Sequence, residues 1–244
     1  QTDYNCINCH SFRMHGSDNM LFHMRATHGG TYVWTGGKLE KIDGKVSEGI
    51  QSLVYPYWHS SGNYVAFSTN KTNQMFHMKD KNRIEVFDAA SEVLVYDVKN
   101  HRVLTDSLLF SKDAFETFPS FSPDGKTLYF SSAKAQQMPK DYKKVKYSLC
   151  SISFDAEQGR FGKQVDTLFS AEKEGKTAIL PRVSPDGRFL AFTQADYGNF
   201  AIWHKEADLY LLDLKDGQVK AIPEVNSVEA ESYHAWSSNG RWLV

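Results

Sequence analysis

The chain has 244 residues, which is enough to bury a sizeable core in one or two ordinary domains. Its 28 basic and 29 acidic side chains nearly cancel, so charge gives no reason to expect nucleic acid or an anionic membrane surface as a partner. No apolar run approaches the ~18 residues of a membrane-spanning helix, so we expect no transmembrane span. The chain starts at Gln1 and stops inside a strand pattern, and we therefore expect it to be a piece of a longer protein.

Residues 1–20 show little strand alternation and contain the run Cys6-Ile7-Asn8-Cys9-His10. We expect them to form a short irregular segment ahead of a β domain that occupies residues 21–244. A partial first sheet is predicted over residues 21–50. Its strands are Leu21–Ala26, Thr31–Thr35 and Lys38–Ile42.

A tight-turn motif recurs through the rest of the chain. In its clearest copy, Phe121-Ser122-Pro123-Asp124-Gly125, the proline presets φ, the aspartate can bond to the turn backbone, and the glycine takes a positive φ. Apolar alternation resumes at once, so the turn joins two strands of a hairpin. The equivalent glycines are Gly62, Gly125, Gly187 and Gly240, at steps of 63, 62 and 53 residues. This period predicts an all-β fold, a β-propeller of four-stranded blades.

The motif divides the chain into blades at about 51–110, 111–171 and 172–225, with the start of a next blade at 226–244. The ring is therefore predicted to be incomplete or cropped. A long polar insert follows the second strand of each unit, which argues against a β-sandwich with coincidental turns. The innermost strand of each blade should be the one before the turn. These strands are Leu53–Trp58, Glu116–Phe121, Thr177–Val183 and Ser232–Trp236.

The pattern x-Pro-x-aromatic-Ser-Pro-Asp-Gly, best seen in Phe118–Phe130 and Leu180–Phe192, resembles the TolB-type β-propeller repeat. The whole chain is similar to envelope propellers that carry a Cys-x-x-Cys-His segment ahead of the first blade. This resemblance implies an exported protein of the periplasm or cell envelope, whose partner is an envelope protein or a redox partner. It is compatible with a lipid anchor outside this chain. Propellers of this type also gate serine peptidases and act as polysaccharide lyases, so the fold alone does not select a function.

Cys6, Cys9 and His10 have the spacing of a c-type haem attachment site. Two thiols three positions apart can each form a thioether to the macrocycle, and His10 would be the proximal ligand of the haem iron. For the distal position we favour His23 or Met20, which are near in sequence. The preferred interpretation is one haem c. The cysteines could instead form a disulfide or reactive dithiol, supply half of a metal site, or carry no cofactor.

Charged residues on or beside the innermost strands predict a binding site at the mouth of the central channel. The candidates are Glu116, Lys176, Arg182, Glu231 and His234. They could bind a polar ligand or partner segment, or could pair with one another across the opening. The sequence has neither a Gly-x-Ser-x-Gly nucleophile elbow nor a metalloprotease motif, and we assign no catalytic residue. We therefore predict a non-catalytic envelope binding module that carries one haem c for electron transfer or redox sensing. The alternatives are a haem-free interaction scaffold and, less favoured, a propeller hydrolase or lyase.

Overall fold

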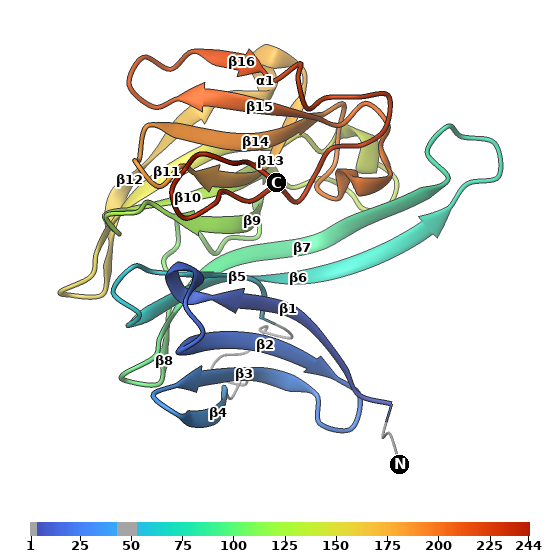
Figure 1. Cartoon of the computed structure of the whole chain (residues 1–244). Helices are drawn as coiled ribbons and strands as arrows, with labels where there is room; N and C mark the ends of the chain where they lie inside the picture. The colour runs from blue at the N-terminus through green and yellow to red at the C-terminus, as the bar shows by residue number, and fades with distance from the viewer. Residues whose placement is uncertain (1–3, 43–52) are drawn as a thin grey trace.

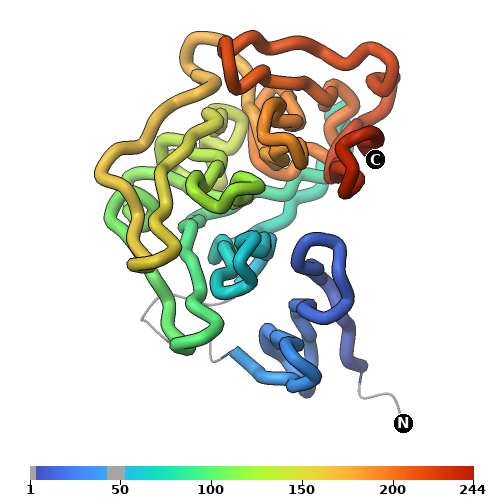
Figure 2. Tube along the Cα trace, turned by 60° about the vertical axis from the view of Figure 1, so that its left-hand side comes forward, coloured from blue at the N-terminus to red at the C-terminus, as the bar shows by residue number. Residues whose placement is uncertain are grey.

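The computed structural model describes residues 4–42 and 53–244, and nearly all of their regular secondary structure is β-strand (Figure 1). Within them, sixteen strands form four antiparallel sheets of four strands each, and the strands of each sheet follow in chain order. The first strands of successive sheets contact one another, because β1 contacts β5, β5 contacts β9 and β9 contacts β13. The four sheets therefore follow one another around a common axis, which they face with their first strands (Figure 2). The predicted all-β propeller of four-stranded blades is confirmed.

Each sheet is one blade, and its strands run in chain order from the axis outward. Blade 1 contains β1 (Cys6–Phe12), β2 (Asn19–Arg25), β3 (Gly30–Thr35) and β4 (Lys38–Ile42). Blade 2 contains β5 (Val54–Trp58), β6 (Tyr64–Phe76), β7 (Ile84–Asp97) and β8 (Arg102–Leu104). Blade 3 contains β9 (Ala114–Phe121), β10 (Thr127–Lys134), β11 (Ser148–Asp155) and β12 (Arg160–Phe169). Blade 4 contains β13 (Thr177–Val183), β14 (Phe189–Ala195), β15 (Asp208–Asp213) and β16 (Val219–Ala221).

Helical structure is confined to single turns in the described residues. They are η1 (Arg13–His15), η3 (Tyr142–Lys144), α1 (Ala171–Glu174) and η4 (Ala201–Trp203). None of these turns has the length or apolar character of a membrane-spanning helix. After blade 4, Trp236 and Leu243 form an isolated antiparallel bridge, which opens a further repeat.

The N-terminal boundary differs from the predicted one. The described part of the predicted irregular segment contains a strand of the ring, because Cys6–Phe12 pairs with β2 from Cys6 opposite Arg25 to Phe12 opposite Met20, with a register shift between Asn8 and Ser11. The first blade is therefore a four-stranded sheet like the others, and not a partial unit that starts at residue 21. The predicted boundary between residues 50 and 51 lies outside the described residues, as do residues 1–3 and 43–52.

Each repeat copy contains one residue with a left-handed backbone, seven positions before a glycine. These residues are Cys9, Tyr55, Phe118, Leu180 and Tyr233, with φ between 49° and 58°. In the four blades this residue lies where the pairing of the first and second strands shifts, which is the behaviour of a β-bulge. The bulge identifies Cys9–Gly16 as a degenerate copy of the same repeat. Its Phe12 stands where Trp58 and Phe121 stand in the next two copies.

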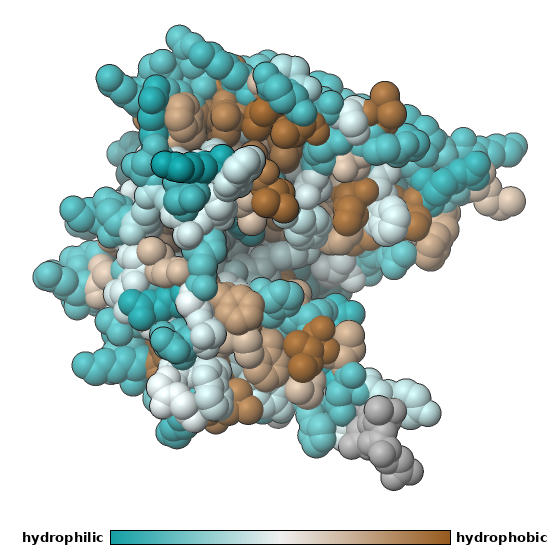
Figure 3. All heavy atoms as spheres, viewed as in Figure 1, coloured by the Kyte–Doolittle hydropathy of each residue, from teal (hydrophilic) through white to brown (hydrophobic). Residues whose placement is uncertain are grey.

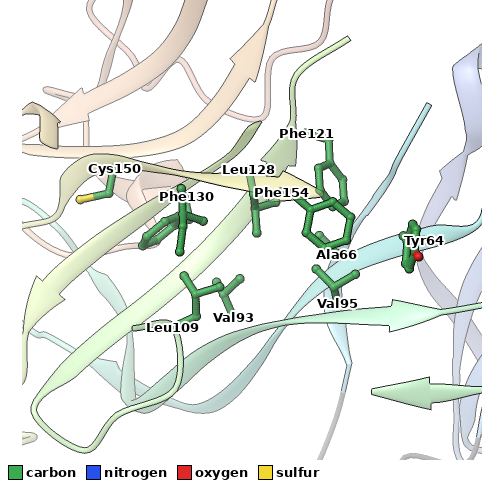
Figure 4. Packing of buried hydrophobic residues seen from close by; sticks show 11 residues of the cluster. Tyr64, Ala66, Val93, Val95, Leu109, Phe121, Leu128, Phe130, Cys150 and Phe154 are labelled. Carbon is green, nitrogen blue, oxygen red and sulfur yellow. The ribbon is translucent and has the colours of Figure 1, made fainter. Parts of the chain in front are cut away.

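The hydrophobic core lies between adjacent blades. Ala66, Val93 and Val95 of blade 2 face Phe121, Leu128, Phe130 and Phe154 of blade 3 (Figure 4). A second cluster joins blade 1 to blade 2, and a third joins blade 3 to blade 4. Because burial of one large apolar side chain stabilises by about 1.5–3 kcal/mol, these clusters hold the sheets in their order around the axis.

The Ser-Pro-Asp-Gly turns are fixed by short local hydrogen bonds. Ser122 Oγ donates to Asp124 Oδ1 over 2.6 Å and accepts from the backbone N–H of Thr127 over 3.0 Å, while Asp124 Oδ1 also accepts from the Lys126 N–H. These bonds hold the pKa of Asp124 below its usual value. Ser184 and Asp186 repeat the arrangement in blade 4, so both aspartates build turns.

Gly125 and Gly187 provide a matched test of how the turns contact neighbouring blades. Both have φ of +73°, but a Cβ on Gly125 would overlap the ring of His59, whereas a Cβ on Gly187 would meet open space. His59 is buried, and its Nε2 lies 3.0 Å from Gly125 O. We expect Gly187→Ala to lower the free energy of unfolding by about 1 kcal/mol through backbone strain, and Gly125→Ala by about 2–3 kcal/mol. Urea unfolding measures both, and equal losses would contradict a tight contact with His59.

Candidate functional site

The five residues predicted to share the channel mouth do not gather in one place. Lys176 Nζ pairs with Asp196 Oδ1 over 2.6 Å, beside the insert that follows β14. Glu231 Oε1 accepts a hydrogen bond of 2.6 Å from Ser227 Oγ. Among the described residues, none of the five predicted residues forms an ion pair with another of them.

Glu116 lies inside the protein, between blades 2 and 3. Its side chain is 3% exposed, Ser132 Oγ donates to its Oε1 over 3.4 Å, and its Oε2 has no hydrogen-bond partner. Burial, and after it the nearby Glu92 carboxylate, raise the pKa of Glu116 to about 8. Burial also raises the pKa of Glu92 to about 7, although the Ser111 N–H donates to it. The two carboxyl groups therefore hold protons at a pH where most carboxyl groups have lost them.

His234 is also buried, directly after the left-handed residue Tyr233. Three other copies have a proline at this position, namely Pro56, Pro119 and Pro181, and the first copy has His10. Burial, followed by the positive charge of Arg182, lowers the pKa of His234 to about 4. The imidazole is therefore neutral at physiological pH and packs in the place of a proline ring.

Arg182 faces the ring axis. Its Cζ lies 5.4 Å from the centroid of the Tyr57 ring, although Arg182 belongs to blade 4 and Tyr57 to blade 2. Because blade 3 stands between these two blades, the contact crosses the axis. Arg182 Nη1 donates to Pro181 O over 2.8 Å, and in the described part of the chain no carboxylate lies within 4.0 Å of the guanidinium. Burial lowers the pKa of Arg182 from its usual value.

A hollow of about 150 Å³ opens beside Tyr57, at the end of the ring where the turns lie. Three blades supply its apolar wall: Phe12 and Met14 from blade 1, Tyr57 and Trp58 from blade 2, and Phe121 and Pro123 from blade 3. Phe12 and Met14 are exposed. We call this feature the turn-side mouth. The face in Figure 3 is also hollowed between blade 1, at the bottom, and the C-terminal segment above it.

The β6–β7 hairpin reaches beyond blade 2, and we call its outer part the arm (residues 70–92; Figure 1). At its base, Asp88 is buried and accepts hydrogen bonds from Asn70 Nδ2 and Thr72 Oγ1, each of 2.6 Å, and from Asn199 Nδ2 of blade 4. Further out, Glu85 accepts from the Tyr197 hydroxyl and lies 3.1 Å from His204 Nε2. These contacts anchor the arm to the insert of blade 4. The arm also contacts blade 3, where Lys143 Nζ pairs with Asp80 Oδ2 over 2.8 Å.

The Cys-x-x-Cys-His run lies on β1. Cys6 and His10 are exposed, Cys9 is half-buried, and both cysteines are free thiols. Burial raises the pKa of Cys9, while a hydrogen bond with the Tyr55 backbone opposes that effect. Cys9 occupies the left-handed repeat position, so its side chain has the place that Tyr55, Phe118 and Leu180 fill in the next three copies.

The paired strand does not present these groups to a single porphyrin. A three-residue step along a strand spans about 10 Å, and here it separates an exposed thiol from one that is packed against blade 2. His23 and Met20 lie on the adjacent strand β2, and His23 Nδ1 is 3.1 Å from Thr31 Oγ1. Side chains on neighbouring strands project in parallel, whereas axial ligands approach iron from opposite sides. A haem on Cys6, Cys9 and His10 would therefore require the start of β1 to leave β2.

No clustered metal site offers an alternative in the described ranges, where no three His, Cys, Asp or Glu side chains come together to hold a metal ion. Sequence reasoning missed Tyr57 as the partner of Arg182. The available signal was its place in the repeat, since both residues stand two positions after the left-handed residue.

Comparison with known proteins supports the architecture. No family model matches the chain. Dipeptidyl-peptidase 5 of Porphyromonas gingivalis is 21% identical over 210 residues, which cover 76% of this chain and 29% of that protein. A prolyl endopeptidase structure superposes with a TM-score of 0.57 at 13% identity, over 89% of this chain and 29% of that one. The Cps50 (Swd1) β-propeller domain of Myceliophteria thermophila superposes with a TM-score of 0.55 at 11% identity, over 97% of this chain and 60% of that one. The fold is a β-propeller.

The propeller spans less than a third of the peptidase relative, and these likenesses show the fold alone. A structure described as TolB of Agrobacterium tumefaciens is among the neighbours, with a TM-score of 0.42 at 12% identity over 89% of this chain and 80% of that one. A score at that level does not distinguish TolB from other propellers. The propeller part of the predicted resemblance is confirmed, and the envelope group with Cys-x-x-Cys-His stays a prediction.

Proposed function

We propose that this propeller is a non-catalytic binding module of an envelope protein, and that it holds a polar segment of a partner protein at the turn-side mouth. The observation that supports it is the hollow of about 150 Å³ walled by the inner-strand ends of three blades. Apolar walls with a few polar groups at their base are typical of binding sites. Phe12 and Met14 stand exposed at its rim, where a partner would cover them.

Site-specific photocrosslinking in the native host tests this role. A benzoylphenylalanine in place of Met14 should capture one partner, because residue 14 lines the mouth. The same group in place of Lys220, an exposed residue on the outermost strand of blade 4, should capture none. Equal capture from both positions, or none from residue 14, would overturn the proposed mouth.

We place the protein in the periplasm or cell envelope. This proposal is supported by the TolB-type repeat pattern at Phe118–Phe130, which is typical of envelope propellers. Fractionation of the native host with periplasmic and cytoplasmic marker proteins tests it. Recovery of the protein with the cytoplasmic marker would contradict it.

A covalent haem c on Cys6, Cys9 and His10 is part of the same proposal. It is supported by the spacing of these residues in the sequence, and it requires the start of β1 to leave β2. When bound, a haem would supply one-electron chemistry for transfer or redox sensing. Expression with the cytochrome c maturation machinery should then add the mass of one haem and give a Soret band. A Cys6→Ser/Cys9→Ser variant is the control, and a colourless wild-type product of unmodified mass would remove the haem.

A second candidate is the propeller domain of a peptidase, and it is favoured by the similarity to Dipeptidyl-peptidase 5. The natural full-length protein should then release arylamines from dipeptidyl-arylamide substrates and react with a fluorophosphonate serine probe. If the full-length protein lacks both properties, the peptidase candidate fails and the binding module stands. For the lyase alternative, an oligogalacturonate lyase structure from Vibrio parahaemolyticus superposes with a TM-score of 0.54 at 9% identity, a likeness that supports the fold alone.

A further inference from the structure

One layer of side chains surrounds the axis at the position two residues after the left-handed residue. Its members are Ser11, Tyr57, Ser120, Arg182 and Ala235. At two of these positions the backbone carbonyl accepts a hydrogen bond from a tryptophan of the following repeat. Trp58 Nε1 donates to Ser11 O over 3.2 Å, and Trp236 Nε1 donates to Arg182 O over 2.9 Å. Because Arg182 also lies on the ring of Tyr57 across the axis, the layer converges on a shared space.

The layer holds a positive charge and no negative one. Arg182 is half-buried, and in the described residues the only polar contact of its guanidinium is the Pro181 carbonyl, while no acid comes within ion-pair distance. Removing a cation from water without a counter-charge is costly, and the cation–π contact with the Tyr57 ring offsets only part of that cost. An anion on the axis would complete the compensation.

Ser120 supplies a second, independent sign of a ligand. Its side chain is 0% exposed and its Oγ has no hydrogen-bond partner. By repeat position it stands in the same layer, on β9, which lies between the strands of Tyr57 and Arg182. A buried hydroxyl without a partner costs about 1–3 kcal/mol, which a ligand oxygen would recover.

We propose that this layer is an oxyanion site, in which the Arg182 guanidinium and the Ser120 hydroxyl hold a carboxylate or phosphate group against Tyr57. The planar guanidinium can donate two parallel hydrogen bonds to either group. The site rests on the proposed binding role, because it names the chemical group by which a partner or ligand is held below the turn-side mouth. Half-burial of Arg182 and Tyr57 leaves both side chains within reach of solvent.

An NMR titration of the arginine Nε–Hε signals tests the site, with sodium acetate and sodium phosphate as probes and sodium chloride at equal ionic strength as reference. The Arg182 signal is assigned by its absence in Arg182→Gln. It should shift saturably with acetate or phosphate, and the tighter probe identifies the ligand group. Arg188, an exposed arginine beside the blade 4 turn, should shift only as it does in chloride.

Two variants sharpen the result. Ser120→Ala should weaken the saturable binding about threefold to tenfold, and Arg188→Gln should leave it unchanged. A shift at Arg182 that stays linear, or that Arg188 matches, would overturn the site. If the residue-14 crosslink persists in Arg182→Gln and wild-type protein binds neither probe, the oxyanion site fails while the binding module stands. Saturable probe binding without any crosslink would support the site and overturn the proposed mouth.

Discussion

Raising the pH from 6.5 to 8 should lower the free energy of unfolding by about 2 kcal/mol, chiefly through Glu116. Burial raises the pKa of Glu116 to about 8, whereas in the unfolded chain it returns to 4.5. The folded protein therefore binds more protons than the unfolded chain between these values. The stability is fully present below pH 4.5 and is lost as the pH rises through 8, at up to about 1.4 kcal/mol per pH unit. Glu92, with its pKa raised to about 7, acts in the same direction.

The window starts at pH 6.5 because buried histidines act in the opposite direction below it. Burial lowers the pKa of His59 and His234 in the folded protein. Below their ordinary pKa the unfolded chain therefore binds more protons at these residues, and acid lowers the free energy of unfolding. Above about pH 7 both are largely neutral in the folded and unfolded states, and between pH 6.5 and 7 their remaining effect opposes that of the carboxyl groups. The slope there reports mainly the carboxyl pair between blades 2 and 3.

Glu116→Gln isolates the effect. The amide has the shape of the protonated acid but does not ionise, so most of the decline between pH 6.5 and 8 should disappear. Between pH 6.5 and 8 the free energy of unfolding of the variant, relative to that of wild type, should rise by about 2 kcal/mol. Glu157→Gln, an exposed change in the β11–β12 turn, should leave the wild-type slope. Urea unfolding at several pH values measures all three proteins, and a Glu116→Gln slope as steep as that of wild type would contradict the assignment.

Asp88→Ala should cost about 3 kcal/mol or more of unfolding free energy. The change removes the acceptor of Asn70, Thr72 and Asn199. The buried Asn199 donor left without a partner costs about 1–3 kcal/mol, and the lost hydrogen bonds of the less buried Asn70 and Thr72 add to it. The cost of burying the carboxylate, which raises the pKa of Asp88, offsets part of this loss. Urea unfolding gives the value.

Asp155→Ala is the matched control, because Asp155 also accepts two hydrogen bonds but is exposed in the β11–β12 turn. It should cost under about 1 kcal/mol. Tryptic cleavage at Lys79 and Lys81, at the tip of the arm, should accelerate in Asp88→Ala only. Equal costs for the two aspartates would show that the cluster at Asp88 does not anchor the arm.

Local chemistry explains why the propeller could be predicted from sequence. Ser122, Pro123, Asp124 and Gly125 form a turn whose hydrogen bonds all lie within six residues, so residue types determine its shape. The alternation of apolar and polar residues on either side of the turn predicts the two strands of each hairpin. Four strands per blade and the recurring insert follow from these local signals.

The first blade could not be predicted in the same way. Cys9–Gly16 retains the backbone of the repeat but has Arg13, Met14 and His15 in place of the serine, proline and aspartate of the turn. A left-handed φ at Cys9 has no residue-type signal. The candidate site was predicted only in part for a related reason. Arg182 was recognisable as a charge on an inner strand, whereas its contact with Tyr57 depends on how blades 2 and 4 close around the axis. Likewise, the burial of Glu116 depends on the packing of one blade on the next.

The arm has a consequence for how this ring would come apart. In repeat proteins each unit contacts only its neighbours, so units can be lost one at a time from an end. Here the arm of blade 2 contacts blade 3 and also reaches beyond it to Asn199 and His204 of blade 4. Loss of blade 4 would leave the buried Asp88 and Glu85 of blade 2 without these partners, two units away. The three sheets are therefore expected to unfold as one cooperative unit.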